Sequence, residues 1–147
     1  MPILNVKVSG AKDAVLTRAI AELLLDLNAR ILHKKREVTA IAIDYIDPEC
    51  WIVAGRTLAE HGKRSFYLDI RITDETNTKD EKAAYIREVY AGFGRLLGEL
   101  HEESYIHVHD VRAATYGYGG LTQEYRYQHP PAASDPRLSA IPRAPPA

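Results

Sequence analysis

The sequence predicts an α+β domain of two layers: a tandem β-α-β repeat with a four-stranded mixed sheet and two helices on one face. Four short segments have the apolar alternation or β-branched composition of strands, and two longer ones carry apolar residues at helical spacing. They occur in the order strand, helix, strand, twice over. A helix of this length suits the crossover between parallel strands, so each half is expected to form one β-α-β unit.

The first half contains a strand-like segment at residues 2–8, whose apolar side chains alternate. The apolar stripe of residues 13–32 predicts a helix with one buried face. Basic residues follow at 33–36, where cations favour a helix C-terminus. Residues 38–46 have the β-branched, apolar composition of a buried strand.

The second half repeats this order, with strands expected at 65–72 and 104–111. Thr78 and Glu81 have the spacing of a capping box, which predicts that the second helix starts at Thr78. Three glycines weaken the helix prediction slightly, but could allow close packing on the sheet: Gly92, Gly94 and Gly98.

With both helices on one side, the other face of the sheet stays bare. Residues 104–111 alternate with period two and place Tyr105, His107 and His109 on that face. A two-layer domain with a half-exposed sheet predicts oligomerisation through the bare face.

A similar appendage follows the second strand of each half, at residues 48–60 and 114–124. Together with the repeated order of elements, this similarity indicates an internal duplication. In both appendages an aromatic residue and a turn of small residues lead to a leucine and then a glutamate: Leu58 and Glu60 in the first, Leu121 and Glu124 in the second.

The domain is expected to span residues 1–128, with half-repeats at about 2–60 and 65–128. From residue 129 the composition changes, because six of the eight prolines fall at 130–146. The tail at 129–147 is therefore expected to be disordered.

Composition excludes several classes of protein. A net charge of -1 over 147 residues gives no bulk electrostatic case for binding nucleic acid or membranes. Cys50 is the only cysteine, so no intrachain disulfide or thiolate metal cluster can form. The N-terminus enters a strand without a basic or apolar leader, so the expected location is the cytoplasm.

Proline directly follows the initiator methionine. Removal of Met1 would leave Pro2 with a free secondary amine, whose reference pKa is about 8. Apolar surroundings and nearby cations lower the pKa of an amine, which makes it a base near the working pH. The structural alternative is that proline simply suits the first residue of a strand.

These features together resemble the tautomerase superfamily, that of 4-oxalocrotonate tautomerase and macrophage migration inhibitory factor. The resemblance covers about residues 2–128. It depends on Pro2 opening the first strand, on the doubled β-α-β order, on the Tyr-Gly-Tyr-Gly-Gly turn at 116–120, and on the strand at 104–110. The segment at 48–55 looks like a first-half copy of that turn.

The resemblance implies a homotrimer with active sites between neighbouring subunits and no cofactor or metal. It implies that Pro2 is the proton-transfer residue. Tyr105 and His107 fall where the family has residues that reach a neighbour's proline. Arg71 and Lys12 fall near positions that bind the substrate carboxylate.

The sequence also departs from two patterns within the family. Glu75 and Asn77 stand where malonate semialdehyde decarboxylase has paired arginines, and Asn28 stands where cis-3-chloroacrylic acid dehalogenase has a catalytic histidine. Both departures argue against decarboxylation and dehalogenation.

The expected chemistry is a 1,3-proton transfer on a small 2-oxo or 2-hydroxy-enoic acid. Arg71 would bind the carboxylate bidentately, Lys12 is the second candidate cation, and Tyr105 or His107 would donate a hydrogen bond to the enolate oxygen. Each residue also has a structural interpretation. Arg71 could pair with Asp69 or Glu75 at the surface, and Lys12 could be solvated. Tyr105 and His107 could only pack at an interface.

Three alternatives remain open at this stage. The same proline could serve a hydratase, dehalogenase or decarboxylase, with His107 or Glu124 activating water. The chain could be a binding trimer with a vestigial proline. His107 and His109 point the same way along their strand and could bind a metal, but no third ligand stands out.

Overall fold

A computed structural model describes residues 2–131. Its main sheet has four strands in the order β2-β1-β5-β6. The outer pairs β1–β2 and β5–β6 are parallel, and the central pair β1–β5 is antiparallel, so the sheet is mixed as predicted. The strands are β1 (Ile3–Ser9), β2 (Ala40–Ile46), β5 (Phe66–Thr73) and β6 (Tyr105–Val111).

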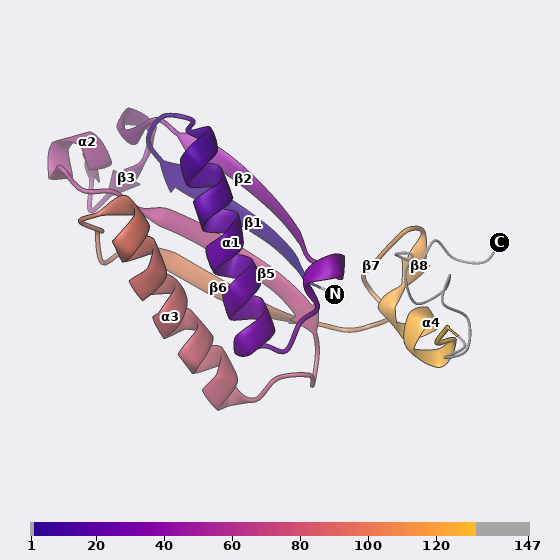
Figure 1. Cartoon of the computed structure of the whole chain (residues 1–147). Helices are drawn as coiled ribbons and strands as arrows, with labels where there is room; N and C mark the ends of the chain where they lie inside the picture. Colours follow the sequence, from indigo (N-terminus) through magenta and orange to yellow (C-terminus); the bar gives the residue numbers. More distant parts are fainter. Residues whose placement is uncertain (1, 132–147) are drawn as a thin grey trace.

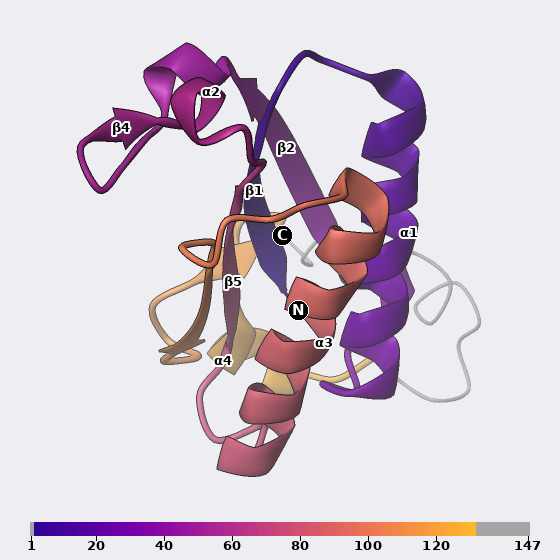
Figure 2. The same cartoon turned by 90° about the vertical axis from the view of Figure 1, so that its left-hand side faces the viewer.

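Both long helices, α1 (Ala14–Arg30) and α3 (Lys79–Leu97), cover the same face of the sheet (Figures 1 and 2). The side chain of Asp13 caps α1 by accepting the N–H groups of Val15 and Leu16. Thr78 and Glu81 form the capping box that the sequence predicts, so α3 starts where expected. The two-layer α+β class is confirmed.

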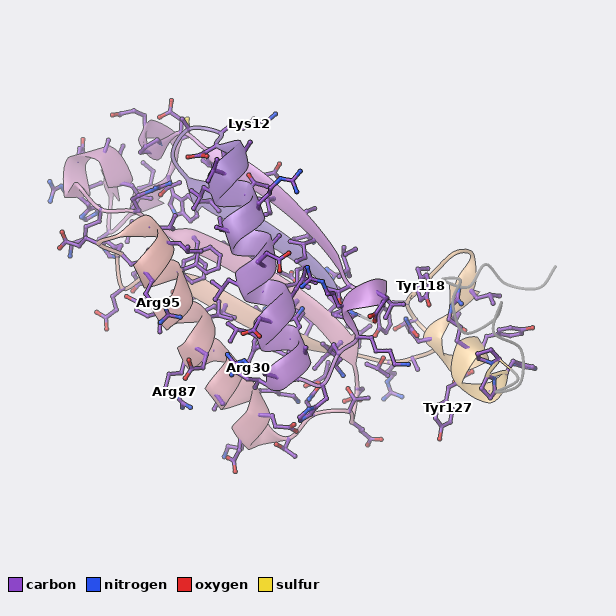
Figure 3. The ribbon with its side chains drawn as sticks, viewed as in Figure 1. Lys12, Arg30, Arg87, Arg95, Tyr118 and Tyr127 are labelled. Atoms are coloured by element: carbon purple, nitrogen blue, oxygen red, sulfur yellow. The ribbon has the colours of Figure 1, made fainter. Side chains whose placement is uncertain are left out.

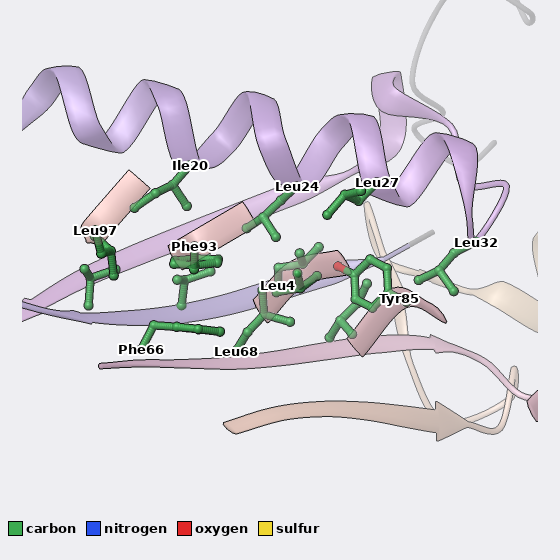
Figure 4. Close-up of a cluster of buried hydrophobic side chains, with 14 of the residues drawn as sticks. Leu4, Ile20, Leu24, Leu27, Leu32, Phe66, Leu68, Tyr85, Phe93 and Leu97 are labelled. Carbon is green, nitrogen blue, oxygen red and sulfur yellow. The ribbon is translucent and has the colours of Figure 1, made fainter. Parts of the chain in front are cut away.

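The core fills the space between the helices and one face of the sheet (Figure 4). Phe66 and Phe93 stack with ring centroids 3.9 Å apart and join β5 to α3. The even-numbered residues of β1 and β5 face this core, so the odd-numbered ones face the bare side. The core strand residues are Leu4, Val6, Val8, Phe66, Leu68, Ile70 and Ile72, all buried.

The glycines of α3 serve a different purpose from the one expected. A Cβ on Gly92 would lie 2.6 Å from Cδ1 of Leu23, which belongs to α1. Gly92 therefore lets the two helices approach each other, and does not bring α3 onto the sheet. Gly94 has ordinary room for a Cβ, and Gly98 ends the helix with a positive φ of 89°.

Each half ends in a short arm made of a two-stranded hairpin and a helix. The first arm contains β3 (Ile52–Val53), β4 (Arg56–Thr57) and α2 (Leu58–His61). The second contains β7 (Gly117–Tyr118), β8 (Leu121–Thr122) and α4 (Gln123–Gln128).

The two arms match at a constant offset of 65 residues. Thr57 and Thr122 cap the two helices, and the carbonyl groups of Trp51 and Tyr116 accept from the residues that follow those caps. The sequence alignment of Leu58 with Leu121 was therefore wrong, because Leu58 corresponds to Gln123. The hairpin backbone, rather than the leucine and glutamate, is what the repeat preserves.

The second arm projects from the end of the sheet at which the N-terminus lies (Figure 1). The first arm lies at the opposite end. The disordered tail expected at residues 129–147 falls almost entirely outside the described residues. No helix in the described part of the chain combines the length and the apolar character needed to cross a membrane.

Candidate active site

Pro2 lies directly before β1, at one end of the sheet. It is buried, and its carbonyl oxygen accepts a hydrogen bond of 3.2 Å from the N–H of Ala40. The next residue, Ile3, pairs with Ala40 of β2 on one side and with Arg71 of β5 on the other. The sheet therefore fixes Pro2 at a defined position beside Arg71.

Arg71 is the predicted site residue that the fold places nearest to Pro2 in the register. Its side chain is 51% exposed on the bare face, and its Nε lies 3.8 Å from Oδ1 of Asp69. Arg71 therefore does pair with an acidic neighbour, but only through this long contact. Such a contact leaves the planar guanidinium able to bind a carboxylate bidentately.

His109 completes a row across the bare face. Arg71 pairs with His109 in the parallel register of β5 and β6, so the row runs Ile3, Arg71, His109. Nε2 of His109 lies 3.2 Å from Oδ2 of Asp69, an ion pair when the imidazole is protonated. The rings of His107 and His109 lie with their centroids 3.6 Å apart.

Asp69 is the most enclosed ionisable side chain of this face. The residue is 9% exposed, and its Oδ1 atom is buried without a hydrogen-bond partner. A buried carboxylate oxygen without a hydrogen-bond partner costs folding free energy. Asp69 is therefore a group whose burial calls for a functional explanation. Sequence reasoning considered Asp69 only as a partner of Arg71 and missed this.

The second arm brings one tyrosine to the same end of the sheet. The hydroxyl groups of Tyr116 and Thr73 are 2.6 Å apart, and Thr73 is the last residue of β5. Burial raises the pKa of Tyr116, while its hydrogen bond with Thr73 acts in the opposite direction. Tyr116 therefore stays protonated near neutral pH and is a further candidate hydrogen-bond donor that sequence reasoning missed.

The other predicted residues lie away from the Pro2 of their own chain. Tyr105 starts β6 and pairs with Tyr67, four residues along β5 from Arg71. At roughly 3.3 Å per residue, that is about 13 Å along the sheet. His107 lies in the middle of β6, and exposed Lys12 follows β1 at the far end (Figure 3). Tyr105 and Lys12 cannot share a site with Pro2 within one chain.

Tyr105 is nevertheless part of a concave surface. An open cavity of about 570 Å³ lies between the first arm and the starts of β5 and β6. The hydroxyl of Tyr105 donates to Oε2 of Glu103 at 2.8 Å, and this hydrogen bond raises the pKa of Tyr105. The cavity is lined by Trp51, Ile52, Val53, Ala54, Phe66, Tyr67, His101, Glu103 and Tyr105.

Two of the residues that depart from the family patterns, Asn28 and Asn77, make hydrogen bonds within the fold. Asn28 is buried in α1, where its Oδ1 accepts from the hydroxyl of Tyr85. Asn77 donates to the carbonyl of Leu32, and Glu75 is exposed in the loop before α3. Within residues 2–131, no three side chains of the metal-binding types gather into one site.

The sequence signal that could have pointed to Asp69 is the alternation of residues along its strand. Asp69 and His109 occupy odd positions, and these face the bare side in both strands. The alternation alone shows which face a residue takes, but not which residue of another strand lies beside it. Only the parallel pairing of β5 with β6 brings Asp69, Arg71 and His109 together.

The sequence matches no family model and no curated protein. Solved structures do match. A fused 4-OT, solved as a wild-type symmetric trimer, has a TM-score of 0.72 and 18% identity, over 83% of this chain and 96% of that chain. A protein solved after inactivation by 2-oxo-3-pentynoate has a TM-score of 0.72 and 13% identity, over 84% and 98%.

A third match is a macrophage migration inhibitory factor-like protein from Entamoeba histolytica. It has a TM-score of 0.65 and 13% identity, over 80% of this chain and 94% of that chain. At these identities the likeness concerns the fold, and it covers nearly the full length of each structure. The chain therefore has the fold of the fused 4-OT structures and of the macrophage migration inhibitory factor-like protein, as the sequence resemblance predicted.

Proposed function

We propose that this chain is a cofactor-independent tautomerase that transfers a proton between oxygen and carbon of a 2-hydroxy-enoic or 2-oxo acid. The amine of Pro2, freed by removal of Met1, is the base. One observation carries the proposal: Pro2 directly precedes Ile3, which pairs with Arg71, and Arg71 is half exposed and only loosely paired. A base and a carboxylate-binding cation thus share one end of the sheet.

The reaction needs no oxidant and no metal. The neutral Pro2 nitrogen removes the proton from the enol oxygen, the electron pair moves into the enolate, and a proton returns to carbon. Arg71 binds the substrate carboxylate, and its charge also favours the neutral form of a nearby amine. A hydrogen-bond donor at the enolate oxygen lowers the barrier, which is the role we assign to Tyr105 or His107 of a neighbouring subunit.

A neighbouring subunit is needed because Tyr105 and Lys12 lie too far from the Pro2 of their own chain. We infer a homotrimer that associates through the bare sheet face. The side chain of Tyr105 on that face is 62% exposed, and the second arm projects away from its own body (Figure 1). A fused 4-OT of the same fold is a symmetric trimer. The cytoplasmic location and the domain boundary at residue 128 remain predictions from the sequence.

The test uses untagged protein whose N-terminus has been verified by mass spectrometry. Ketonisation of phenylenolpyruvate and of 2-hydroxymuconate is measured for the wild type and for Pro2→Ala. We expect the rate constant kcat/KM to fall by about 100-fold or more in the variant, the loss typical of removing a general base. Pro48→Ala, in the 3-10 turn η2 (Pro48–Cys50), is the matched control and should keep the wild-type rate.

A covalent probe gives an independent readout. A protein of this fold was inactivated by 2-oxo-3-pentynoate. We expect this compound to add its mass to the N-terminal peptide of the wild type. The activity lost should be proportional to the fraction of that peptide that is labelled. Equal rates for the wild type and Pro2→Ala, with no label on that peptide, would rule out the proposed chemistry.

A further inference from the structure

We propose that His109, held against Asp69, is the second proton-transfer residue of this site and delivers the proton to the substrate carbon. The inference deepens the proposed function and depends on it. Its starting point is the ion pair on the bare face, in which Nε2 of His109 lies 3.2 Å from Oδ2 of Asp69.

The register places two proton-transfer groups on opposite sides of the cation. β5 carries Arg71 and lies between β1, which begins after Pro2, and β6, which carries His109. Two strand spacings separate Ile3 from His109, about 10 Å in total. A small acid held through its carboxylate by Arg71 would therefore have the Pro2 amine on one side and the His109 ring on the other.

Asp69 acts as a positioning residue and not as a catalytic one. Arg71 follows Asp69 on the same face of β5, and the ring of His107 lies 3.6 Å from that of His109 on β6. The carboxylate of Asp69 contacts Nε2 of His109 and so fixes the orientation of the ring. Within residues 2–131, the other ring nitrogen of His109, Nδ1, makes no hydrogen bond or ion pair, so it is free to deliver a proton.

The step balances without a co-reactant. Pro2 removes the enol proton as the O–H bond breaks, and His109 imidazolium gives its Nδ1 proton to carbon as the C–H bond forms. No electrons are gained or lost overall. The enzyme is left with protonated Pro2 and neutral His109, and exchange with solvent restores both groups.

The experiment compares His109→Gln and Asp69→Asn with two matched controls. His33→Asn removes an exposed histidine in the loop after α1 that pairs with Glu81, and Asp26→Asn removes an exposed carboxylate of α1, away from the bare face. We expect His109→Gln to lower kcat by about 100-fold with KM changed less than about threefold, as for loss of a general acid. The controls should keep wild-type values.

The dependence of kcat/KM on pH separates catalysis from packing. The wild type should give a bell-shaped profile, because Pro2 must be neutral and His109 protonated. His109→Gln should lose the alkaline limb. Asp69→Asn should lower kcat with little change in KM, because Nε2 of His109 loses the carboxylate that orients the ring. Added imidazole should restore part of the rate to His109→Ala, and a purely structural histidine would give no such rescue.

Labelling of Pro2 by 2-oxo-3-pentynoate distinguishes the two ways to fail. If the wild type turns over substrate and is labelled, but His109→Gln keeps the rate and the pH profile of the wild type, His109 has no role in proton transfer. If His109→Gln loses activity and also the label, the residue only maintains the site and the inference is wrong. If the wild type shows neither turnover nor label, the proposed function fails, and this inference fails with it.

Discussion

Tyr85 donates its hydroxyl to Oδ1 of Asn28 at 2.7 Å, and this hydrogen bond joins α3 to α1 inside the core. Both residues are essentially inaccessible to solvent, and the Nδ2 atom of Asn28 has no partner. Asn28, which the sequence resemblance sets against a catalytic histidine of the dehalogenase, is thus a residue of the helix interface.

Burial raises the pKa of Tyr85 well above its ordinary value of 10.0. The folded state therefore favours the neutral phenol, and this contribution to stability is complete below pH 10 and declines as pH rises further. We predict that the free energy of unfolding of the wild type falls more steeply above about pH 10 than that of Tyr85→Phe. Urea titrations between pH 8 and 11 measure the difference, and parallel curves for the two proteins would contradict it.

At neutral pH the same substitution should destabilise the protein. Tyr85→Phe leaves Oδ1 of Asn28 buried without its donor, which costs about 1–3 kcal/mol. Tyr90→Phe, on the same helix and less buried, serves as the control. Equal urea midpoints for the two variants would show that the Tyr85–Asn28 hydrogen bond contributes nothing.

The close approach of the two helices at Gly92 gives a second stability prediction. Gly92→Ala places a Cβ 2.6 Å from Cδ1 of Leu23 and should cost about 1–3 kcal/mol through overpacking. Gly94→Ala lies two residues along α3, where the nearest atom is 3.8 Å away, and should gain up to about 1 kcal/mol of helix propensity. Thermal unfolding of both variants tests this, because the melting temperature should fall for Gly92→Ala and rise for Gly94→Ala.

Arg71 should act mainly on substrate binding. Arg71→Gln removes the cation that we propose binds the carboxylate. We therefore predict that KM rises by at least about tenfold, as for loss of a charged hydrogen bond. Arg71→Lys should recover part of this because it keeps the charge but not the bidentate geometry. Arg95→Gln, on the exposed side of α3, is the control (Figure 3). An unchanged KM in Arg71→Gln would exclude Arg71 from the site.

The bare face provides a test of association. Ala42 is exposed in β2 on that face, where it pairs with Asn5, and Ala91 is exposed on α3. We predict that Ala42→Glu disrupts the trimer, because it places a charge in the interface without a partner. Ala91→Glu should leave the trimer intact. Sedimentation velocity measures both, and a trimeric Ala42→Glu protein would place the interface elsewhere.

Local pattern predicted most of the fold. The alternation of β1, the apolar stripe of α1 and the Thr78–Glu81 capping box gave each element within a few residues, because these signals act over neighbouring residues. The doubled order of elements then limited how the strands could pair. The alignment of the two arms was the exception. It matched Leu58 with Leu121, whereas the hairpins superimpose Leu58 on Gln123.

The sequence by itself determined that Pro2 opens a strand, that two helices cover one sheet face, and that Tyr105, His107 and His109 face the other side. Tertiary structure alone decided which of these residues meet. The antiparallel pairing of β1 with β5 sets Ile3, the residue after Pro2, opposite Arg71. The parallel pairing of β5 with β6 sets Arg71 opposite His109, whose Nε2 reaches Asp69. Periodicity records the face that a side chain takes, whereas register depends on contacts between strands far apart in the sequence.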